Sequence, residues 1–499
     1  MATTSHRPLG LWKEHRAGRG PIGLWLVLAL ALALRVWKLG DKNIGLDEST
    51  SWYLAKSSVS GLVAWTAADM HPPLYYLLLK VWVWIFGDSL VALRGLSVIS
   101  SLIALYLLFR LIEGAMPRAV CYAVMLWCAL SPLSLYQAQE TGMYAPATAV
   151  VLGACLAYRR WIESGATRRS ALLLYGTAAT AALYLHYYTV FAFIAIWLHF
   201  LIVGARTAAP DRTFAVWKAW IVTHVGVVIA YTPWIADALA QATRKQYWAP
   251  VTIGEIPDFA ALLIRGLTFG DHPLPELLSM QGLLAIGVLA LGGACLLMVV
   301  GRKRDEQDVF FASVAYLPGL LALSLLPVSG ALELWWYVPY SSPLLVAAAA
   351  RGLSRAGVPP RVVVGALCVA ALSLVPSVIT YYSTSEKDSD VRPVVAYLLA
   401  HARHGADAAF DPVYVVPIYI ETKLNYYTRD AIPYLWVPPD ADLGSLGQAP
   451  SSDGRGAWLI ADMHSESGFA ELERDPHLQS VHVPGNNPER VRLFHLAPP

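Results

Sequence analysis

The residues best suited to chemistry lie in short polar segments between long apolar runs. Gly45-Leu46-Asp47-Glu48 places two adjacent carboxylates shortly after the first apolar run. A carboxylate at a membrane surface can act as a general base, because partial desolvation raises its pKa towards neutrality. The same pattern also suits a helix start, with Asp47 as the N-cap and Glu48 in the first turn. The dipeptide alone leaves both interpretations open.

A second polar segment contains residues that could bind an anion. His71 precedes two prolines, and Arg94 lies near the start of the next apolar run. A protonated His71 and Arg94 could together bind a phosphate group. The alternative is structural: the aromatic residues of this segment would anchor it at the membrane interface, and Arg94 would extend towards the headgroups.

Three further turns between apolar runs supply the remaining candidates, which are Glu140 with Tyr144, His186 with Tyr187, and Tyr337. Each of these residues alone is more typical of a membrane interface than of a catalyst. In one topology, however, all of them fall on the same side of the membrane as Asp47. This convergence favours a common functional site on that side.

The composition of the 499 residues is that of a membrane protein, with 56% hydrophobic and 14% charged residues. Soluble proteins carry about 25% charged residues. These values exclude a soluble enzyme, a disordered chain and a nucleic-acid-binding protein. All five cysteines lie in apolar runs without metal-binding spacing, so we expect neither a disulfide framework nor a cysteine metal site.

The apolar runs predict an α-helical polytopic membrane protein of about eleven transmembrane helices, since one span needs about 20 mostly apolar residues. The predicted spans are 22–38, 91–112, 119–136, 145–162, 170–184, 187–204, 215–236, 279–300, 309–327, 335–350 and 361–381. The shorter run 72–86 is interpreted as a helix lying in the outer interface. A cytoplasmic N-terminus places nineteen Lys and Arg residues inside and eight outside, before the C-terminal region. Residues 39–90 then form a large outer loop of a cytoplasmic-membrane protein.

Residues 383–499 are polar and alternate between helical and strand-like patterns, which predicts an extracytoplasmic α/β domain. Residues 1–382 would form the transmembrane catalytic domain. Within the tail, the expected helices are 391–402, 414–427 and 468–474, and the expected strands are 406–411, 432–437, 457–461 and 491–496. Residues 438–454 are predicted to form a loop.

The ordered set of polar motifs resembles the GT-C superfamily of glycosyltransferases, which use polyprenyl-phosphate sugars. The resemblance is to the branch of protein O-mannosyltransferases and lipid A aminoarabinose transferases. The motifs that carry it are Asp47-Glu48, His71-Pro72-Pro73-Leu74, Phe86-Gly87 with Arg94, Gln139-Glu140 with Met143-Tyr144, His186-Tyr187, and Trp336-Tyr337 with Pro343.

The resemblance implies a role for each candidate. Asp47 would deprotonate an acceptor hydroxyl, which displaces polyprenyl phosphate from the sugar with inversion. The implied catalytic residues are Asp47, Glu48 and Glu140; the implied donor-phosphate ligands are His71, Arg94 and Tyr337; and the implied substrate-binding residues are Tyr144, His186 and Tyr187. The implied partners are a polyprenyl-phosphate-linked sugar, an extracytoplasmic acceptor and the lipid bilayer.

The sequence departs from the family pattern at two positions where many relatives carry Arg, because it has Gly142 and Trp336 there. Either His186 or Arg244-Lys245 supplies the missing positive charge, or the headgroup is held differently. A multi-pass polysaccharide or lipid transporter is the alternative function. A metal-dependent transferase, with carboxylates as oxygen ligands, is a further alternative. We expect no required cofactor and do not favour a divalent metal.

Overall fold

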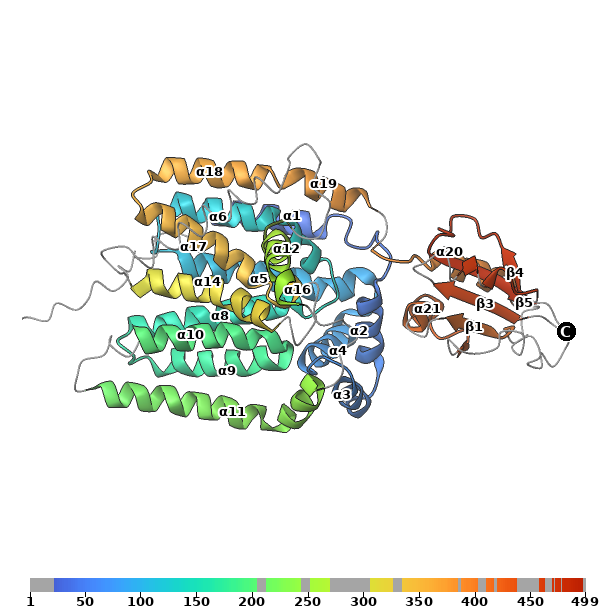
Figure 1. Ribbon diagram of the computed structural model, residues 1–499, viewed down its shortest axis with the longest axis horizontal. Coiled ribbons are helices and arrows are strands. Elements are labelled where there is room, and N and C mark those ends of the chain that lie inside the picture. The colour runs from blue at the N-terminus through green and yellow to red at the C-terminus, as the bar shows by residue number, and fades with distance from the viewer. Residues whose placement is uncertain are drawn as a thin grey trace, which may run out of the picture. The chain divides into compact units, whose positions relative to one another are not determined.

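The computed structural model describes a mostly helical protein (Figure 1). The described residues are 22–203, 212–243, 252–269, 306–325, 334–384, 387–402, 410–416, 420–437, 457–462, 469–470, 472–476 and 478–496. Contacts divide the chain into two compact units. The first unit comprises residues 1–37, 59–78 and 94–383, and the second comprises 38–58, 79–93 and 384–499.

Mostly apolar helices of very different lengths make up the first unit. They are α1 (Ile22–Val36), α3 (Val59–Ala68), most of α5 (Leu90–Ile112), α6 (Arg118–Leu130), α7 (Pro132–Ala138), α8 (Tyr144–Glu163), α9 (Arg169–Leu185), α10 (Val190–Ile202), α11 (Thr213–Thr243), α12 (Ile256–Phe269), α14 (Glu306–Ser324), α16 (Leu334–Tyr337), α17 (Ser341–Arg355), α18 (Pro360–Leu372) and α19 (Val375–Ser383). Each predicted span within the described residues falls on one or two of these helices. The predicted span 279–300 lies outside the described residues.

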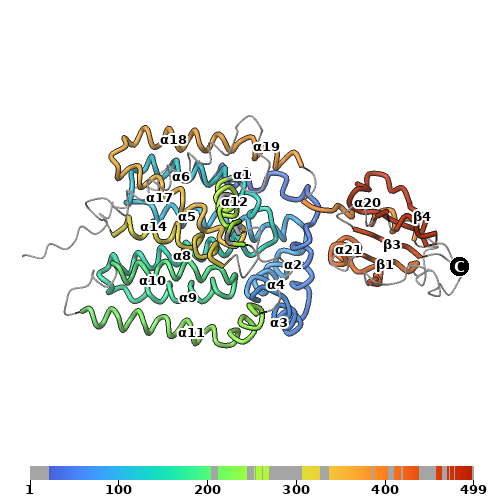
Figure 2. Tube along the Cα trace, viewed as in Figure 1, coloured from blue at the N-terminus to red at the C-terminus, as the bar shows by residue number. Residues whose placement is uncertain are grey.

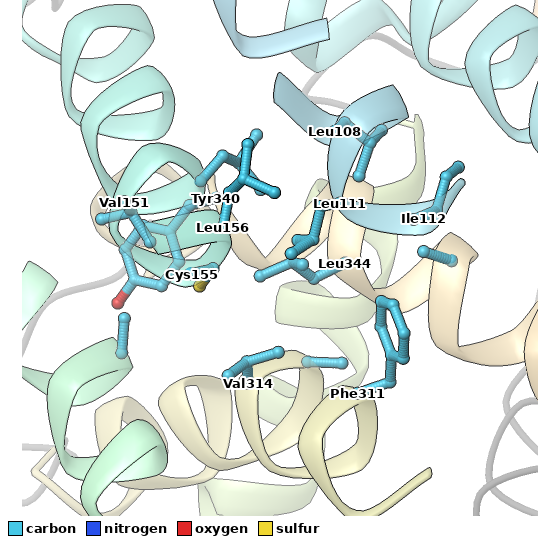
Figure 3. Close-up of a cluster of buried hydrophobic side chains, with 14 of the residues drawn as sticks. Leu108, Leu111, Ile112, Val151, Cys155, Leu156, Phe311, Val314, Tyr340 and Leu344 are labelled. Carbon is cyan, nitrogen blue, oxygen red and sulfur yellow. The ribbon is translucent and has the colours of Figure 1, made fainter. Parts of the chain in front are cut away.

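Helices of the first unit pack side by side, and several neighbours are distant in sequence. Helix α18 lies along α6, and α14 lies along both α10 and α17 (Figure 2). Their common core is made of buried aliphatic and aromatic side chains. Leu108 of α5, Val151 of α8, Phe311 of α14 and Leu344 of α17 meet in it (Figure 3).

Four helices of the described residues are long and apolar enough to cross a membrane. They are Leu90–Ile112, Thr213–Thr243, Glu306–Ser324 and Pro360–Ser383, and the bent pair α6–α7 adds a fifth if it is one span. That pair bends by 59°. Ser131 lies at the bend and Pro132 begins the next helix, where a proline is tolerated because the first helical N–H groups have no intrahelical acceptor. The count of eleven spans stays a prediction.

The second unit contains helix α2 (Leu46–Lys56), part of α4 (Leu74–Phe86) and a five-stranded sheet in the order β2-β1-β3-β5-β4. The strands are β1 (Val413–Val416), β2 (Tyr434–Trp436), β3 (Ala457–Asp462), β4 (Leu478–Val481) and β5 (Val491–Leu496). Strands β2, β1 and β3 pair in parallel, whereas β5 is antiparallel to both β3 and β4.

Alternation along the strands gives this sheet two apolar faces. Val413 and Ile460 face the buried side chains of α20 (Arg392–His401) and α21 (Glu421–Thr428). Tyr414 and Leu459 pack on the other side, against Phe469. Apolar side chains therefore pack on both faces of the sheet within this unit, whereas Leu435 and Trp436 of the edge strand β2 are exposed.

The tail differs from its sequence prediction at two places. A helix over 414–427 is wrong at its start, because Val413–Val416 forms β1 and the helix is shorter, at Glu421–Thr428. The run Val-Tyr-Val-Val is rich in β-branched residues that favour a strand. Strand β4 is absent from the prediction, because Leu-Gln-Ser-Val is only four residues long and has apolar residues only at its two ends. Most of the predicted strand 406–411 and the loop 438–454 lie outside the described residues.

Candidate active site

Helix α2 begins immediately before the two adjacent acids. Its N-cap is Gly45, in an extended conformation with φ −74° and ψ 166°. The alternative that Asp47 is the N-cap is therefore wrong. The capping interaction comes instead from Glu48, whose carboxylate accepts a hydrogen bond from the Gly45 N–H at 2.9 Å. This is the N3 half of a capping box.

The two acids have opposite environments. Asp47 is exposed, whereas Glu48 is fully buried and forms an ion pair with Lys387 at 3.1 Å. The difference arises because neighbouring helical residues point about 100° apart, so they cannot share one face. Asp47 is thus accessible to a substrate, whereas Glu48 is committed to contacts inside the second unit. The catalytic assignments of both acids stay predictions.

His71 lies in the first unit, on the segment between α3 and α4. Its Nδ1 is 3.6 Å from the Asp69 carboxylate, and its ring centre is 6.2 Å from that of His186. The sequence prediction did not include Asp69. A carboxylate at this position can orient the imidazole, as acids do beside functional histidines. The structure therefore brings two of the predicted site histidines together.

An aromatic cluster surrounds His186, which lies in the turn between α9 and α10. The ring centres of Tyr144 and Tyr337 are 5.9 and 5.6 Å from that of His186. Tyr188 stacks on Tyr337 at 5.1 Å, and Trp336 lies 5.6 Å from Tyr144. Four predicted site residues from distant segments, namely His71, Tyr144, His186 and Tyr337, thus form one continuous cluster. Such a surface suits the stacking and hydrogen bonding of a sugar ring or a headgroup.

His186 is neutral near pH 7. Burial, together with the neighbouring His71, lowers the pKa of His186 to about 3. Its Nδ1 accepts a hydrogen bond from the Tyr188 N–H at 3.3 Å, which caps the following turn. Without a bound anion, His186 therefore carries no positive charge, and its role in compensating for the missing arginines stays a prediction. The other candidates for that charge, Arg244 and Lys245, lie outside the described residues.

Tyr187 connects helices rather than pointing freely at a substrate. Its hydroxyl donates to Gln241 Oε1 at 2.5 Å and accepts from Trp234 Nε1 at 2.9 Å. Gln241 in turn donates to the Thr66 carbonyl at the end of α3, at 2.8 Å. These bonds tie α11 to α3 and give the hydroxyl two partners. The predicted substrate-binding role of Tyr187 stays untested.

Arg94 and Glu140 are both buried, with 1% and 7% exposed surface. Arg94 lies in the first turns of α5, and Glu140 lies in the turn between α7 and α8. Gln139 fixes this turn, because its Nε2 donates to the Arg35 carbonyl at 2.9 Å and its Oε1 accepts from the Tyr381 hydroxyl at 2.9 Å. The turn is therefore anchored to α1 and α19, and Glu140 has a defined place on it.

A cavity of about 40 Å³ lies among α5, α6, α7, α8 and the start of α17. Two of its lining groups, Gln137 Nε2 and Thr148 Oγ1, are buried and have no hydrogen-bond partner among the described residues. A water needs roughly 10–15 Å³ of such volume and several polar partners. The cavity therefore suits ordered water better than a sugar.

The described part of the chain contains no group of three or more His, Cys, Asp and Glu side chains arranged to hold a metal ion. The expectation that the protein needs no metal or cofactor stays a prediction. The sequence prediction also missed Lys387 and Asp388, which contact the first turn of α2. The only sequence signal for them is the charged stretch after the last apolar run.

Part of the first unit matches a known protein family by sequence. The sequence model of the family described as dolichyl-phosphate-mannose-protein mannosyltransferase matches residues 70–236. No curated protein matches the chain by sequence. The family match over residues 70–236 confirms the resemblance to the GT-C glycosyltransferases for this part of the chain.

Solved structures extend the likeness over nearly the whole chain. ArnT from Cupriavidus metallidurans in the apo state matches with a TM-score of 0.61 and 13% identity, covering 95% of this chain and 99% of that one. ArnT bound to undecaprenyl phosphate matches with a TM-score of 0.56 and 14% identity over the same shares. The archaeal oligosaccharyltransferase AglB from Archaeoglobus fulgidus, in complex with an inhibitory peptide and a dolichol-phosphate, matches with a TM-score of 0.50 and 11% identity, covering 95% and 74%. At these identities the likeness establishes a shared fold.

Proposed function

We propose that the protein is a membrane glycosyltransferase that transfers a sugar from a polyprenyl-phosphate donor to an extracytoplasmic acceptor. The observation that carries this proposal is the fold, which is shared with an ArnT structure bound to undecaprenyl phosphate. The family match over residues 70–236 supports the same reaction class. The exposed Asp47, beside a fully paired Glu48, gives the chain one accessible acid at the start of α2.

In the proposed reaction, Asp47 accepts the proton of the acceptor hydroxyl. The acceptor oxygen bonds to the anomeric carbon on the face opposite the donor phosphate. The bond between that carbon and the phosphate oxygen breaks, and polyprenyl phosphate leaves with the electron pair. The sugar configuration is inverted. Arg94 and His71 would stabilise the charge that develops on the leaving phosphate.

The clustered aromatic residues have a separate role in this proposal. Tyr144, His186 and Tyr337 would contact the sugar or the headgroup as a neutral surface, since His186 is uncharged near neutrality. Glu140 would bind the acceptor or the sugar. We further propose that this chemistry takes place on the outer face of the cytoplasmic membrane, with the N-terminus inside.

The partners of polar residues within apolar helices favour a transferase over a transporter. Arg35 donates hydrogen bonds to Ser101 Oγ and Ser134 Oγ, both at 2.8 Å. His224 is bonded to the Tyr175 hydroxyl at 3.1 Å and to the Trp220 carbonyl at 2.9 Å. Arg35 thus bonds to α5 and α7, and His224 bonds to α9 and to its own helix. Both polar groups are satisfied by protein partners, as in a packed helix bundle.

A deletion strain tests the proposal directly. Mass analysis of its surface glycans and lipid-linked sugars should reveal a missing glycan substituent and an accumulated polyprenyl-phosphate sugar. Wild-type protein should restore both, and Asp47→Asn at equal abundance should restore neither. If the donor accumulates but is found in the inner leaflet alone, the transferase proposal fails in favour of transport. If Asp47→Asn complements fully, Asp47 is not the base.

A further inference from the structure

The first turn of α2 is held by a segment 342 residues away in sequence. The Leu46 N–H donates to Asp388 Oδ2 at 2.9 Å, so a side chain from the tail satisfies one of the free N–H groups at this helix end. Glu48, two residues later, forms its ion pair with the adjacent Lys387. Asp47 lies between these two attachment points.

The attachments belong to one partly buried network of paired charges, in which the Asp388 side chain is 33% exposed. Lys423 of α21 forms an ion pair with Asp388 at 2.7 Å, and the Lys387 and Lys423 side chains are each only 3% exposed. Asn43 completes the network, because its Nδ2 donates to the Asp388 carbonyl at 3.3 Å and its Oδ1 accepts from the Lys387 N–H at 2.8 Å. Each buried charge here thus has an opposite partner.

The rest of α2 has separate attachments within the second unit. The Ser49 hydroxyl is 2.8 Å from that of Thr422, and Trp52 donates to Asp88 at 3.0 Å. Further along the helix, Lys80 donates to the Ala55 carbonyl at 3.1 Å. Loss of Asp388 should therefore loosen the first turn while the body of the helix stays in place.

We propose that Asp388 is a positioning residue, which holds the first turn of α2 so that Asp47 keeps its reactive orientation. This inference rests on the proposed function, in which Asp47 is the base. In this arrangement the tail takes part in catalysis without touching substrate. A displacement of even 1 Å in a catalytic group can cost about 100-fold in rate.

The test compares Asp388→Ala with Asp388→Asn/Lys423→Gln in purified full-length protein. The double variant keeps an oxygen for the Leu46 N–H and an amide donor at position 423, but removes both charges. Asp390→Asn is the matched control, since Asp390 is a nearby acid that bonds to Arg392 instead of α2. Each kcat is normalised to the number of sites that bind undecaprenyl phosphate, so that unfolded protein does not count.

Asp388→Ala should lower the normalised kcat at least 10-fold and change the donor KM less than about 3-fold. The double variant should stay within about 3-fold of wild type, and the control should be unchanged. Deuterium uptake at residues 46–49 should rise in Asp388→Ala alone. An unchanged normalised kcat or unchanged deuterium uptake in Asp388→Ala would overturn the positioning role.

Asp47→Asn, measured in parallel, separates this inference from the proposed function. An inactive Asp47→Asn beside a fully active Asp388→Ala refutes only the positioning role. An active Asp47→Asn refutes the base itself, whatever Asp388→Ala does.

Discussion

The indole Nε1 of Trp52 donates a hydrogen bond to Asp88 Oδ2 at 3.0 Å, which links α2 to the turn between α4 and α5. Two cations face the same carboxylate, with Arg429 at 2.8 Å and Lys56 at 3.6 Å. The Arg429 guanidinium also lies over the Tyr426 ring, 4.7 Å from its centre. This cluster is a second attachment of α2, separate from the one at its first turn.

Asp88 should stabilise the protein in a pH-dependent way. Partial burial would raise the pKa of Asp88, but the Trp52 hydrogen bond, Arg429 and Lys56 together lower it below its usual value. A lowered pKa in the folded state means that the stabilisation is fully present above the unfolded-state pKa and is lost as the pH falls through the folded-state value. Asp88→Asn should therefore cost about 1 kcal/mol at pH 7, because solvent screens this partly exposed carboxylate.

Thermal unfolding in detergent at a series of pH values measures this effect. The difference in unfolding temperature between wild type and Asp88→Asn should be present at pH 7 and should shrink below about pH 4. Asp41→Asn is the control, since Asp41 is exposed and its carboxylate has no hydrogen bond or ion pair to any described residue. A difference that stays constant down to pH 3 would contradict the assigned pKa direction.

Asp47→Asn should abolish turnover while preserving folding and donor binding. Asp47 is not the N-cap of α2, so its replacement removes no capping interaction. Loss of a general base should cost at least about 100-fold in kcat. Turnover with a polyprenyl-phosphate sugar, together with donor affinity, measures both properties in one preparation. Wild-type turnover in this variant would end the proposed mechanism, though not the fold.

Glu48→Gln should act mainly on stability. The glutamine can still accept the Gly45 N–H bond, but Lys387 would be left buried without its acid. Breaking one side of a buried pair costs about 3–5 kcal/mol, whereas removing both charges is often nearly neutral. Glu48→Gln should therefore lower the free energy of unfolding by that amount, and Glu48→Gln/Lys387→Met should recover much of it. The folded fraction of Glu48→Gln should keep more activity than Asp47→Asn. If Glu48→Gln and Asp47→Asn are equally inactive and the wild-type activity is lost on addition of a chelator, the metal-dependent transferase is favoured instead.

The sequence predicts the helices of the first unit well, because long apolar runs have few alternatives to a buried helix. Helix α8 (Tyr144–Glu163) matches the predicted span 145–162 closely. Shorter segments are harder, since Val413–Val416 is four residues of a strand beside a helix and carries little periodic signal. Local pattern cannot separate such pieces.

The candidate site is predictable in its residue types but not in its pairings. Tyr144, His186 and Tyr337 stand out in the sequence because their motifs lie between apolar runs, but the contacts among their rings come only from the fold. The pairing of Glu48 with Lys387 leaves no local signal, because its partners meet only through the tertiary fold. The pKa of His186 likewise depends on burial, which the sequence alone does not determine.

Reporter fusions test the predicted membrane topology. A reporter placed after Arg304 should lie in the cytoplasm, and one placed after Lys387 should lie outside, because nineteen Lys and Arg residues fall on the predicted inner side against eight on the outer side. A paired alkaline phosphatase and green fluorescent protein fusion at each position measures this. If both positions report the same side, the eleven-span count is wrong.

Arg94→Ala and His71→Ala should weaken donor binding, with Arg94→Ala the more damaging. Arg94 carries a permanent charge and a forked set of donors, so its removal takes both from the proposed phosphate site. A histidine side chain lacks the forked donors of a guanidinium, so the contribution of His71 to phosphate binding is smaller. Titration with undecaprenyl phosphate should show at least a 10-fold loss of affinity for Arg94→Ala. Arg94→Lys, which keeps the charge but not the forked donor geometry, should retain part of it. Wild-type affinity in both alanine variants would remove Arg94 and His71 from the phosphate site and leave the donor headgroup to other residues.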